Sequence, residues 1–343
     1  MLVKKSRIPV IHLLTIGMLP SFVKKLIYRM RGYHIAKGVK LNFGAVVIGK
    51  DVTIGEAVSI GFFTVVRARV IRVDRFVTIG SLSFLDTERI EIGEDSRIRE
   101  QVQVAGLAEP GSMLRIGKRC CIMQNSNLNP TRLITMDDDS GIGGHCLLFT
   151  HASWLSQLEG FPVKFGPITI GKNVWIPWRV FITAGVTIGD HVLVGPNTVI
   201  SQDIPSNSLA AGTPLKITPH IFKPVNENSR KKIIDEIFTG FMEYLNYHHF
   251  KHQVTAFQNG FEIIIEGNGK HHLVYLSAPA DIPAKAKDSV LVTDYDHQSS
   301  ESIRKNFGML ISLSLKERSG SGELGEEMAR YFSRFGIRFN RID

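Results

Sequence analysis

The sequence predicts a β-solenoid of stacked three-sided coils, preceded by a basic helical extension and followed by a smaller α/β domain. The main observation is an aliphatic residue at every sixth position, most regularly at Ile170, Ile176, Ile182, Ile188, Val194 and Ile200. A helix face repeats every 3.6 residues, and a hairpin array shows turn clusters between longer alternating runs. A period of six therefore indicates one short side of a triangular prism per hexapeptide.

The same template recurs through most of the chain. It appears at Ile48, Ile54, Ile60 and Val66, at Ile92, Ile98 and Val104, and at Ile116, Ile122, Leu128 and Ile134. We expect each aliphatic side chain to point into the prism, while the small residue that often follows it lets the backbone turn at a corner. Three sides make a coil, and coils stack about 4.8 Å apart, so that each strand pairs with those above and below.

Length and cysteine content limit the class of protein. A chain of 343 residues exceeds what one hydrophobic core usually supports, which favours two domains and a terminal extension. The three cysteines, Cys120, Cys121 and Cys146, form no CxxC pair and no even disulfide framework. They are expected to pack as free thiols in a reducing compartment, which predicts a cytoplasmic protein.

The positive charge is confined to the extension, residues 1–37, and its border. Nine of the 41 basic residues lie between Met1 and Lys40, where no acidic residue occurs, and the other 32 balance the 32 acidic residues. The stretch from Ile8 to Met18 is nearly continuously apolar, and apolar residues then recur at helical spacing at Phe22, Val23, Leu26, Ile27 and Met30.

Two interpretations of this extension remain open. The helix either caps the end of the next domain, or lies on the inner face of the cytoplasmic membrane with its lysines toward anionic headgroups. The first apolar run is too short to span a bilayer and lacks a well-formed cleavage site. Nucleic acid is not an expected partner, because basic and aromatic residues do not interleave.

The most specific motifs lie in the second half of the repeat region, at residues 166–176 (GPITIGKNVWI), 184–190 (AGVTIGD), 203–207 (DIPSN) and 211–216 (AGTPLK). In this order they resemble those of the hexapeptide-repeat acyltransferases, the group that contains galactoside, maltose and xenobiotic acetyltransferases and many polysaccharide O-acetyltransferases. The resemblance covers residues 38–219. It implies an all-β left-handed parallel β-helix and a homotrimer with active sites in the clefts between neighbouring prisms.

The resemblance also implies a reaction, the transfer of an acetyl group from acetyl-CoA to a saccharide hydroxyl in cell-envelope or exopolysaccharide biosynthesis. Two alternatives remain open. The same fold acylates amino groups of nucleotide-linked sugars, and a trimeric solenoid can also be a non-catalytic scaffold for the C-terminal domains.

The clearest interruption of the repeat, from Ala152 to Phe165, follows His151. In the resembling enzymes a histidine just before this loop is the general base, which takes the proton of the acceptor hydroxyl as that hydroxyl attacks the thioester. Direct transfer needs no protein nucleophile, but it needs a donor for the oxyanion, such as a backbone N–H. The histidine of the sugar acetyltransferases lies somewhat further along its rung, so His145 is a competing candidate.

Binding residues follow only where the motifs align. The resemblance places Trp178 and Pro196 along the pantetheine, Ser201 and Gln202 near the pyrophosphate, and Lys216 at the nucleotide phosphates. Three positions depart from the residues common in the family. Trp178 stands where a small residue is common, Gln202 where a lysine is common, and Pro219 where an arginine often follows. On the acceptor side, Asn129 and Asp137 match an asparagine and an aspartate that hold sugar hydroxyls, although turns favour the same residue types.

Metal binding is not expected. Carbonic anhydrases of this fold use three histidines, and His145, His151 and His191 are available, but the spacing of the first two differs from theirs. The segment Asp294–Asp296 is interpreted as a turn at the end of a strand.

Residues 225–343 are predicted to form an α/β domain. The expected elements are a helix over 233–245, strands over 261–265, 273–276, 289–293 and 309–315, a helix over 323–335 and a last strand over 337–342. The run Gly320–Gly325 spells GxGxxG, but too little chain follows for a dinucleotide-binding fold, so it is interpreted as a loop. The sequence predicts no role for this domain.

Overall fold

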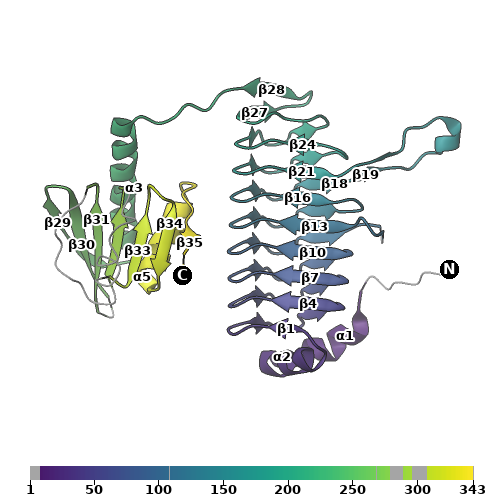
Figure 1. Cartoon of the computed structure of the whole chain (residues 1–343), viewed down its shortest axis with the longest axis horizontal. Helices are drawn as coiled ribbons and strands as arrows, with labels where there is room; N and C mark the ends of the chain where they lie inside the picture. The colour runs from purple at the N-terminus through teal and green to yellow at the C-terminus, as the bar shows by residue number, and fades with distance from the viewer. Residues whose placement is uncertain (1–7, 108, 268, 279–288, 296–306, 343) are drawn as a thin grey trace. The chain divides into compact units, whose positions relative to one another are not determined.

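A computed structural model describes residues 8–107, 109–267, 269–278, 289–295 and 307–342. The chain divides into two compact units, Met1–Lys223 and Pro224–Asp343. Figure 1 shows the elements of both units, each of which is described by itself.

The first unit is a left-handed parallel β-helix (Figure 1). Its three-sided coils agree with the hexad period, and its hand agrees with the family resemblance. Successive strands enter three sheets in rotation, here called sides A, B and C. Side A contains β1 (His34–Ile35), β4 (Asp51–Ile54), β7 (Val70–Val73), β10 (Arg89–Ile92), β13 (Met113–Ile116), β16 (Ile134–Met136), β21 (Ile168–Ile170) and β24 (Thr187–Ile188). Side B contains β2 (Lys40–Leu41), β5 (Ser59–Ile60), β8 (Thr78–Ile79), β11 (Arg97–Ile98), β14 (Cys121–Ile122), β17 (Gly141–Ile142), β22 (Trp175–Ile176), β25 (Leu193–Val194), β27 (Ser208–Ala211) and the antiparallel β28 (Lys216–Pro219). Side C contains β3 (Val46–Ile48), β6 (Val65–Arg67), β9 (Phe84–Asp86), β12 (Gln103–Ala105), β15 (Asn127–Asn129), β18 (Leu147–Phe149), β23 (Phe181–Ile182) and β26 (Val199–Ile200).

The interior of the prism is filled by the hexad residues. Ile170, Ile176, Ile182 and Ile200 are 0% exposed, and Ile188 and Val194 are 1% exposed. Turns between sides bring single residues into the left-handed backbone region, among them His145 (φ 57°), Asn173 (φ 54°) and Asn197 (φ 55°). The turns define an A–B, a B–C and a C–A corner, and residues at one corner of successive coils lie above one another.

The longer connections of the prism gather at the C–A corner. Segment 106–112 joins β12 to β13, segment 130–133 joins β15 to β16, and the long loop joins β18 to β21. This loop leaves the coil as an antiparallel pair, β19 (His151–Ala152) with β20 (Lys164–Phe165), and carries the short helix η2 (Gln157–Glu159). It projects sideways from the prism (Figure 1).

The base of the prism is closed by α1 (Val10–Leu14), η1 (Ile16–Met18) and α2 (Ser21–Met30). Lys24 and Tyr28 of α2 are 0% and 1% exposed. The Lys24 Nζ donates to the Asn42 carbonyl at 2.6 Å, and the Val47 N–H donates to the Tyr28 hydroxyl at 2.9 Å. The helix therefore caps the first coil, and Lys24 is part of that cap instead of facing headgroups.

No single described helix meets the length and hydropathy expected of a membrane span. One pair, Val10–Met18 with Ser21–Met30, meets them only when taken together, and it is bent by 117°.

The second unit is an α/β domain with one mixed seven-stranded sheet. Its strand order is β29 (Lys251–Phe257), β30 (Gly260–Glu266), β31 (Lys270–Leu276), β32 (Ser289–Thr293), β33 (Met309–Ser312), β34 (Glu317–Gly320) and β35 (Asn340–Arg341). Helices α3 (Glu227–Tyr247) and α5 (Glu323–Ser333) share one apolar core with the sheet, which includes Phe238, Phe241 and Phe332. Both expected helices are present, and β29 and β34 are additional strands. Gly320 ends β34, the rest of the glycine-rich segment leads into α5, and Asp296 lies outside the described residues.

Candidate functional site

His151 stands where the chain leaves the coil, at the C–A corner. Thr150 anchors this point: its hydroxyl donates to the Asn129 carbonyl at 2.7 Å and accepts from the Arg132 N–H at 2.9 Å. The Thr150 carbonyl accepts from the Gly166 N–H at 3.0 Å, which brings the end of the loop back to its start. His151 is therefore held by backbone on both sides of the loop.

Two aromatic rings lie close to the imidazole of His151. The Phe165 ring stacks on it, with centroids 5.8 Å apart and planes inclined by 18°, and the Phe149 ring lies 6.4 Å away. The His151 side chain is half-buried, and its Nδ1 is buried with no hydrogen-bond partner among the described residues. Because buried polar atoms in native proteins nearly always have a partner, the unpaired Nδ1 of His151 needs an explanation, and a catalytic role is one.

Charged groups continue outward from this stack. The Arg132 guanidinium lies over the Phe165 ring, 5.0 Å from its centroid, and forms an ion pair with Glu109. Glu109, Arg132 and Phe165 come from three separate connections, all at the C–A corner. Neither Phe165 nor Arg132 was predicted as a site residue, since neither belongs to the hexad period. The position of Phe165 at the end of the interruption was the one available signal.

Of the predicted acceptor residues, Asn129 lies at the same corner as His151, one coil below it, and Asp137 lies at another corner. Asn129 ends β15, pairs in register with Phe149, and accepts from the Thr131 hydroxyl at 2.8 Å through Oδ1. Asp137 follows β16 and lies at the A–B corner. A single chain therefore does not bring these two side chains together.

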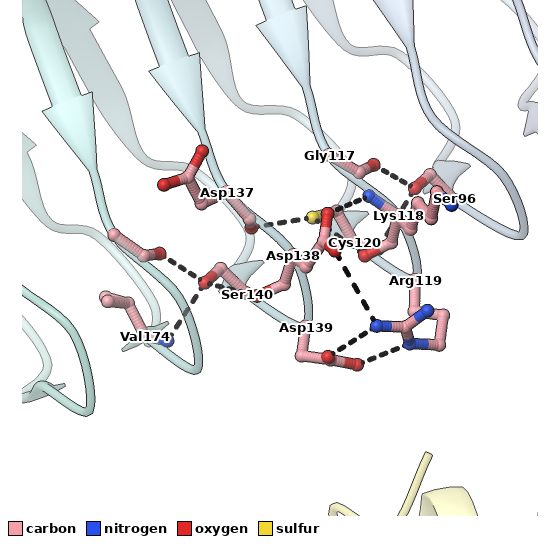
Figure 2. A network of polar contacts seen from close by, with 11 residues as sticks. Ser96, Gly117, Lys118, Arg119, Cys120, Asp137, Asp138, Asp139, Ser140 and Val174 are labelled. Carbon is pink, nitrogen blue, oxygen red and sulfur yellow. Dashed lines mark hydrogen bonds and ion pairs between the residues drawn. The ribbon is translucent and has the colours of Figure 1, made fainter. Parts of the chain in front are cut away.

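The three aspartates at the A–B corner have different roles (Figure 2). Asp138 Oδ1 accepts from the Lys118 N–H at 2.7 Å, and Asp139 accepts two hydrogen bonds from Arg119, each of 2.7 Å. Both join their turn to the turn of the coil below. The exposed Asp137 carboxylate takes part in none of the contacts drawn in Figure 2, where only its backbone carbonyl accepts, from the Cys120 thiol at 3.1 Å. Asp137 alone of the three presents a carboxylate outside this network.

The predicted CoA residues divide between two corners. Trp178, Pro196 and Lys216 lie along the B–C corner in ascending coils, and the Asn197 N–H donates to the Trp178 carbonyl at 3.1 Å. Ser201 and Gln202 follow β26 at the C–A corner, two coils above His151. All five are exposed. Side C separates the two groups within one chain.

Trp178 is held against the turn of the coil below. A Cβ added to Gly144 would lie 2.3 Å from its ring, and the His145 ring lies 6.0 Å away. The indole therefore needs a glycine at position 144. His145, the competing base, is part of this B–C turn and lies at a different corner from His151.

The three histidines considered for a metal lie at three different corners, with His191 at the A–B corner between β24 and β25. Among the residues that the structure describes, no three His, Cys, Asp or Glu side chains form a group suited to a metal ion. Cys120, Cys121 and Cys146 form no disulfide bond among the described residues, and burial raises the pKa of Cys146.

The C-terminal unit has a pocket of its own, of about 730 Å³, lined by residues of α3, α5, β30 and β31. The Tyr244 hydroxyl donates to Glu327 at 2.7 Å in its wall, and this hydrogen bond and burial raise the pKa of Tyr244. Gly322 of the glycine-rich segment also lines the pocket.

Comparison with known proteins agrees with the fold and the motifs. Residues 167–202 match the family model described as bacterial transferase hexapeptide (six repeats). Galactoside O-acetyltransferase of Escherichia coli K12 is 34% identical over 140 residues, which are 37% of this chain and 68% of that protein. The chain belongs to the hexapeptide-repeat acyltransferase family.

Solved structures include similar chains. A maltose O-acetyltransferase from Clostridium difficile 630 is 25% identical with a TM-score of 0.34, over 38% of this chain and 70% of that one. An N-acyltransferase from Bacillus cereus in complex with dTDP and 3-hydroxybutyryl-CoA is 20% identical with a TM-score of 0.35, over 66% of this chain and all of the other. Membership of the family makes the protein an acyl-CoA-dependent acetyltransferase.

Proposed function

We propose that the protein transfers the acetyl group of acetyl-CoA to a hydroxyl of a saccharide, in the cytoplasm and in cell-envelope or exopolysaccharide biosynthesis, with His151 as the general base. The observation that carries this proposal is the position of His151, half-buried and in contact range of two aromatic rings at the start of the extruded loop. The neighbouring Asn129 offers an amide to a sugar hydroxyl at the same corner.

The reaction requires one proton carrier. His151 Nε2 accepts the proton of the acceptor hydroxyl as the hydroxyl oxygen bonds to the acetyl carbon. Collapse of the tetrahedral intermediate then breaks the carbon–sulfur bond, and the imidazolium returns the proton to the departing thiolate. Nδ1 must carry a hydrogen throughout, so the buried Nδ1 needs an acceptor in the working enzyme.

We further propose that a homotrimer completes the site. In neighbouring prisms, the C–A corner of one protomer would face the B–C corner of the next. His151, Ser201 and Gln202 of one chain would then share a cleft with Trp178, Pro196 and Lys216 of its neighbour. The division of the CoA residues between two corners supports this arrangement, because one chain cannot present both groups to one ligand.

The assignment is tested by comparing His151→Ala with His145→Ala in transfer from acetyl-CoA to a panel of sugars. Loss of the base should lower kcat by about 10²–10⁴-fold, whereas His145→Ala should stay within a few-fold of the parent. Sedimentation should show the same oligomer for both variants. An active His151→Ala protein would overturn the mechanism.

The same preparation separates the alternative functions. Faster transfer to amino sugars than to hydroxyl acceptors would identify an N-acyltransferase. Calorimetric titration with CoA that shows no binding would indicate a non-catalytic scaffold.

A further inference from the structure

The cap at the base of the prism presents an apolar stripe to solvent. Phe22, Leu26 and Met30 are spaced four residues apart along α2, so they lie on one face of the helix. Their exposed fractions are 72%, 60% and 79%. Such values are unusual for three large apolar side chains in a row, and they indicate a surface that binds something.

The opposite face of α2 is already used by the fold. Lys24 and Tyr28 are fully buried against the first coil, and Ser21 accepts from the Leu41 N–H at 3.0 Å. The helix is thus fixed to the prism by one face and presents the other away from it. Capping and surface binding are therefore compatible, each with its own set of side chains.

The preceding helix extends the apolar surface at the same end of the prism (Figure 1). Ile11 and Leu14 of α1 are 77% and 65% exposed, and Ile8 and Val10 are more than half exposed. We call Phe22, Leu26 and Met30 together with these four residues the basal patch.

The chain at this end of the prism is basic. Arg31 directly follows α2, Lys37 and Lys40 belong to the first coil, and all three are exposed, while Lys25 of α2 is half-exposed. The first acidic residue of the chain is Asp51. Apolar side chains with a basic border match the boundary between the acyl chains and headgroups of an anionic bilayer. A second copy of the chain is a poorer occupant, since joining two bases would bring like charges together.

We infer that the basal patch docks the protein on an anionic membrane surface, with the prism standing on the bilayer. Phe22, Leu26 and Met30 enter the interface, and Lys25, Arg31, Lys37 and Lys40 meet the headgroups. The inference does not depend on the acyl transfer reaction, because none of these residues belongs to the candidate site.

Flotation of the full chain with vesicles tests this inference. Vesicles of equal parts phosphatidylglycerol and phosphatidylcholine should bind the protein, and vesicles of phosphatidylcholine alone should bind it much more weakly. A first triple variant, Phe22→Ser with Leu26→Ser and Met30→Ser, should bind vesicles with about tenfold or more lower affinity. A second triple variant, Lys25→Gln with Arg31→Gln and Lys37→Gln, should lose about a hundredfold in affinity, and only for the anionic vesicles.

A matched control replaces exposed apolar residues of the other unit, Val254→Ser with Phe335→Ser, and should bind as the parent does. All variants should keep the parent circular dichroism spectrum and acetyl-CoA hydrolysis or transfer rate in solution. Failure of the parent to float, or equal binding by parent and triple serine variant, would overturn the inference. Concentration-dependent association that the triple serine variant abolishes, without vesicle binding, would assign the patch to a second copy instead.

Discussion

His151 and Phe165 stack their rings 5.8 Å apart at the two ends of a loop that separates them by fourteen positions in the sequence. The two residues are also opposite each other in the antiparallel pair of β19 with β20. The orientation of the candidate base is therefore linked to the closure of the loop.

Phe165→Leu should lower kcat about tenfold and leave the KM for acetyl-CoA unchanged, because the smaller side chain keeps the loop apolar but lets the imidazole turn. Steady-state kinetics at several pH values checks this. Phe161→Leu, on the exposed part of the same loop, is the control and should match the parent. Equal losses in both variants would show that loop packing matters more than the ring contact.

Gly144→Ala should move the Trp178 indole, since its Cβ would lie 2.3 Å from the ring. If Trp178 lines the pantetheine site, the KM for acetyl-CoA should rise about as far as in Trp178→Ala, by roughly tenfold. Gly269→Ala, with no atom within 4 Å of the added Cβ, should change neither KM nor stability. An unchanged KM in Gly144→Ala would remove Trp178 from the CoA site.

Lys216→Gln should raise the KM for acetyl-CoA about tenfold at unchanged kcat, because an exposed ammonium at the end of the B–C corner would bind phosphate in the ground and transition states alike. Lys216→Arg should retain most of the affinity. The effect should shrink at high salt, as expected of an exposed ion pair. A fall in kcat with constant KM would contradict a phosphate-binding role.

Asp139→Asn should affect stability, whereas Asp137→Asn should affect acceptor binding. The first weakens the two-pronged contact with the nearly buried Arg119, and should lower the free energy of unfolding by about 1–3 kcal/mol. The second should leave stability unchanged and raise the KM for the acceptor if Asp137 binds sugar. Urea unfolding and acceptor kinetics measure the two effects separately.

Lys24 should make stability rise with pH. Burial lowers the pKa of Lys24 from 10.5 to about 8, so between these values the unfolded chain binds more protons than the folded one. The free energy of unfolding should then increase with pH in this range, by about 1–3 kcal/mol. Burial raises the pKa of Tyr28 from 10.0 to about 12, which has the opposite effect, so measurements should stop at pH 10.

Urea unfolding of Lys24→Met at pH 8 and pH 10 should show no such increase. Lys25→Met, a change on the same helix at a half-exposed position, should keep the parent behaviour. A rise that persists in Lys24→Met would assign it to other groups.

The prism could be predicted from the sequence because its core depends on a local period. Ile170 and Ile200 both lie inside the prism because they occupy the same position of the six-residue repeat, and each hexapeptide has an aliphatic residue at that position. Contacts at the C–A corner do not follow this period. They join three connections of unequal length, through Glu109, Arg132 and Phe165, so the repeat does not predict them. The role of Lys24 was left open between a cap and headgroup contact, because helical spacing alone cannot show which face of α2 meets the first coil.

The separation of Asp137 from His151 has a similar cause. Asp137 follows a side A strand and His151 follows a side C strand. Counting residues along the sequence assigns each of them to a side of the prism only when the lengths of the intervening turns are known. In the C-terminal unit, β29 and β34 were missed because KHQVTAF and ERSG lack the alternating apolar pattern that identified β30 and β31.

The number of coils beneath the extruded loop has a geometric consequence. Five steps along side C lead from β3, in the first coil, to β18, so the imidazole lies about 24 Å above the first coil. On a prism standing upright on a bilayer, a sugar attached directly to its lipid would lie too low, and a sugar several residues out along a lipid-linked glycan would lie at the right height. Inserting or deleting one coil below β16 would shift this height by about 4.8 Å and should change which residue of such a glycan is acetylated.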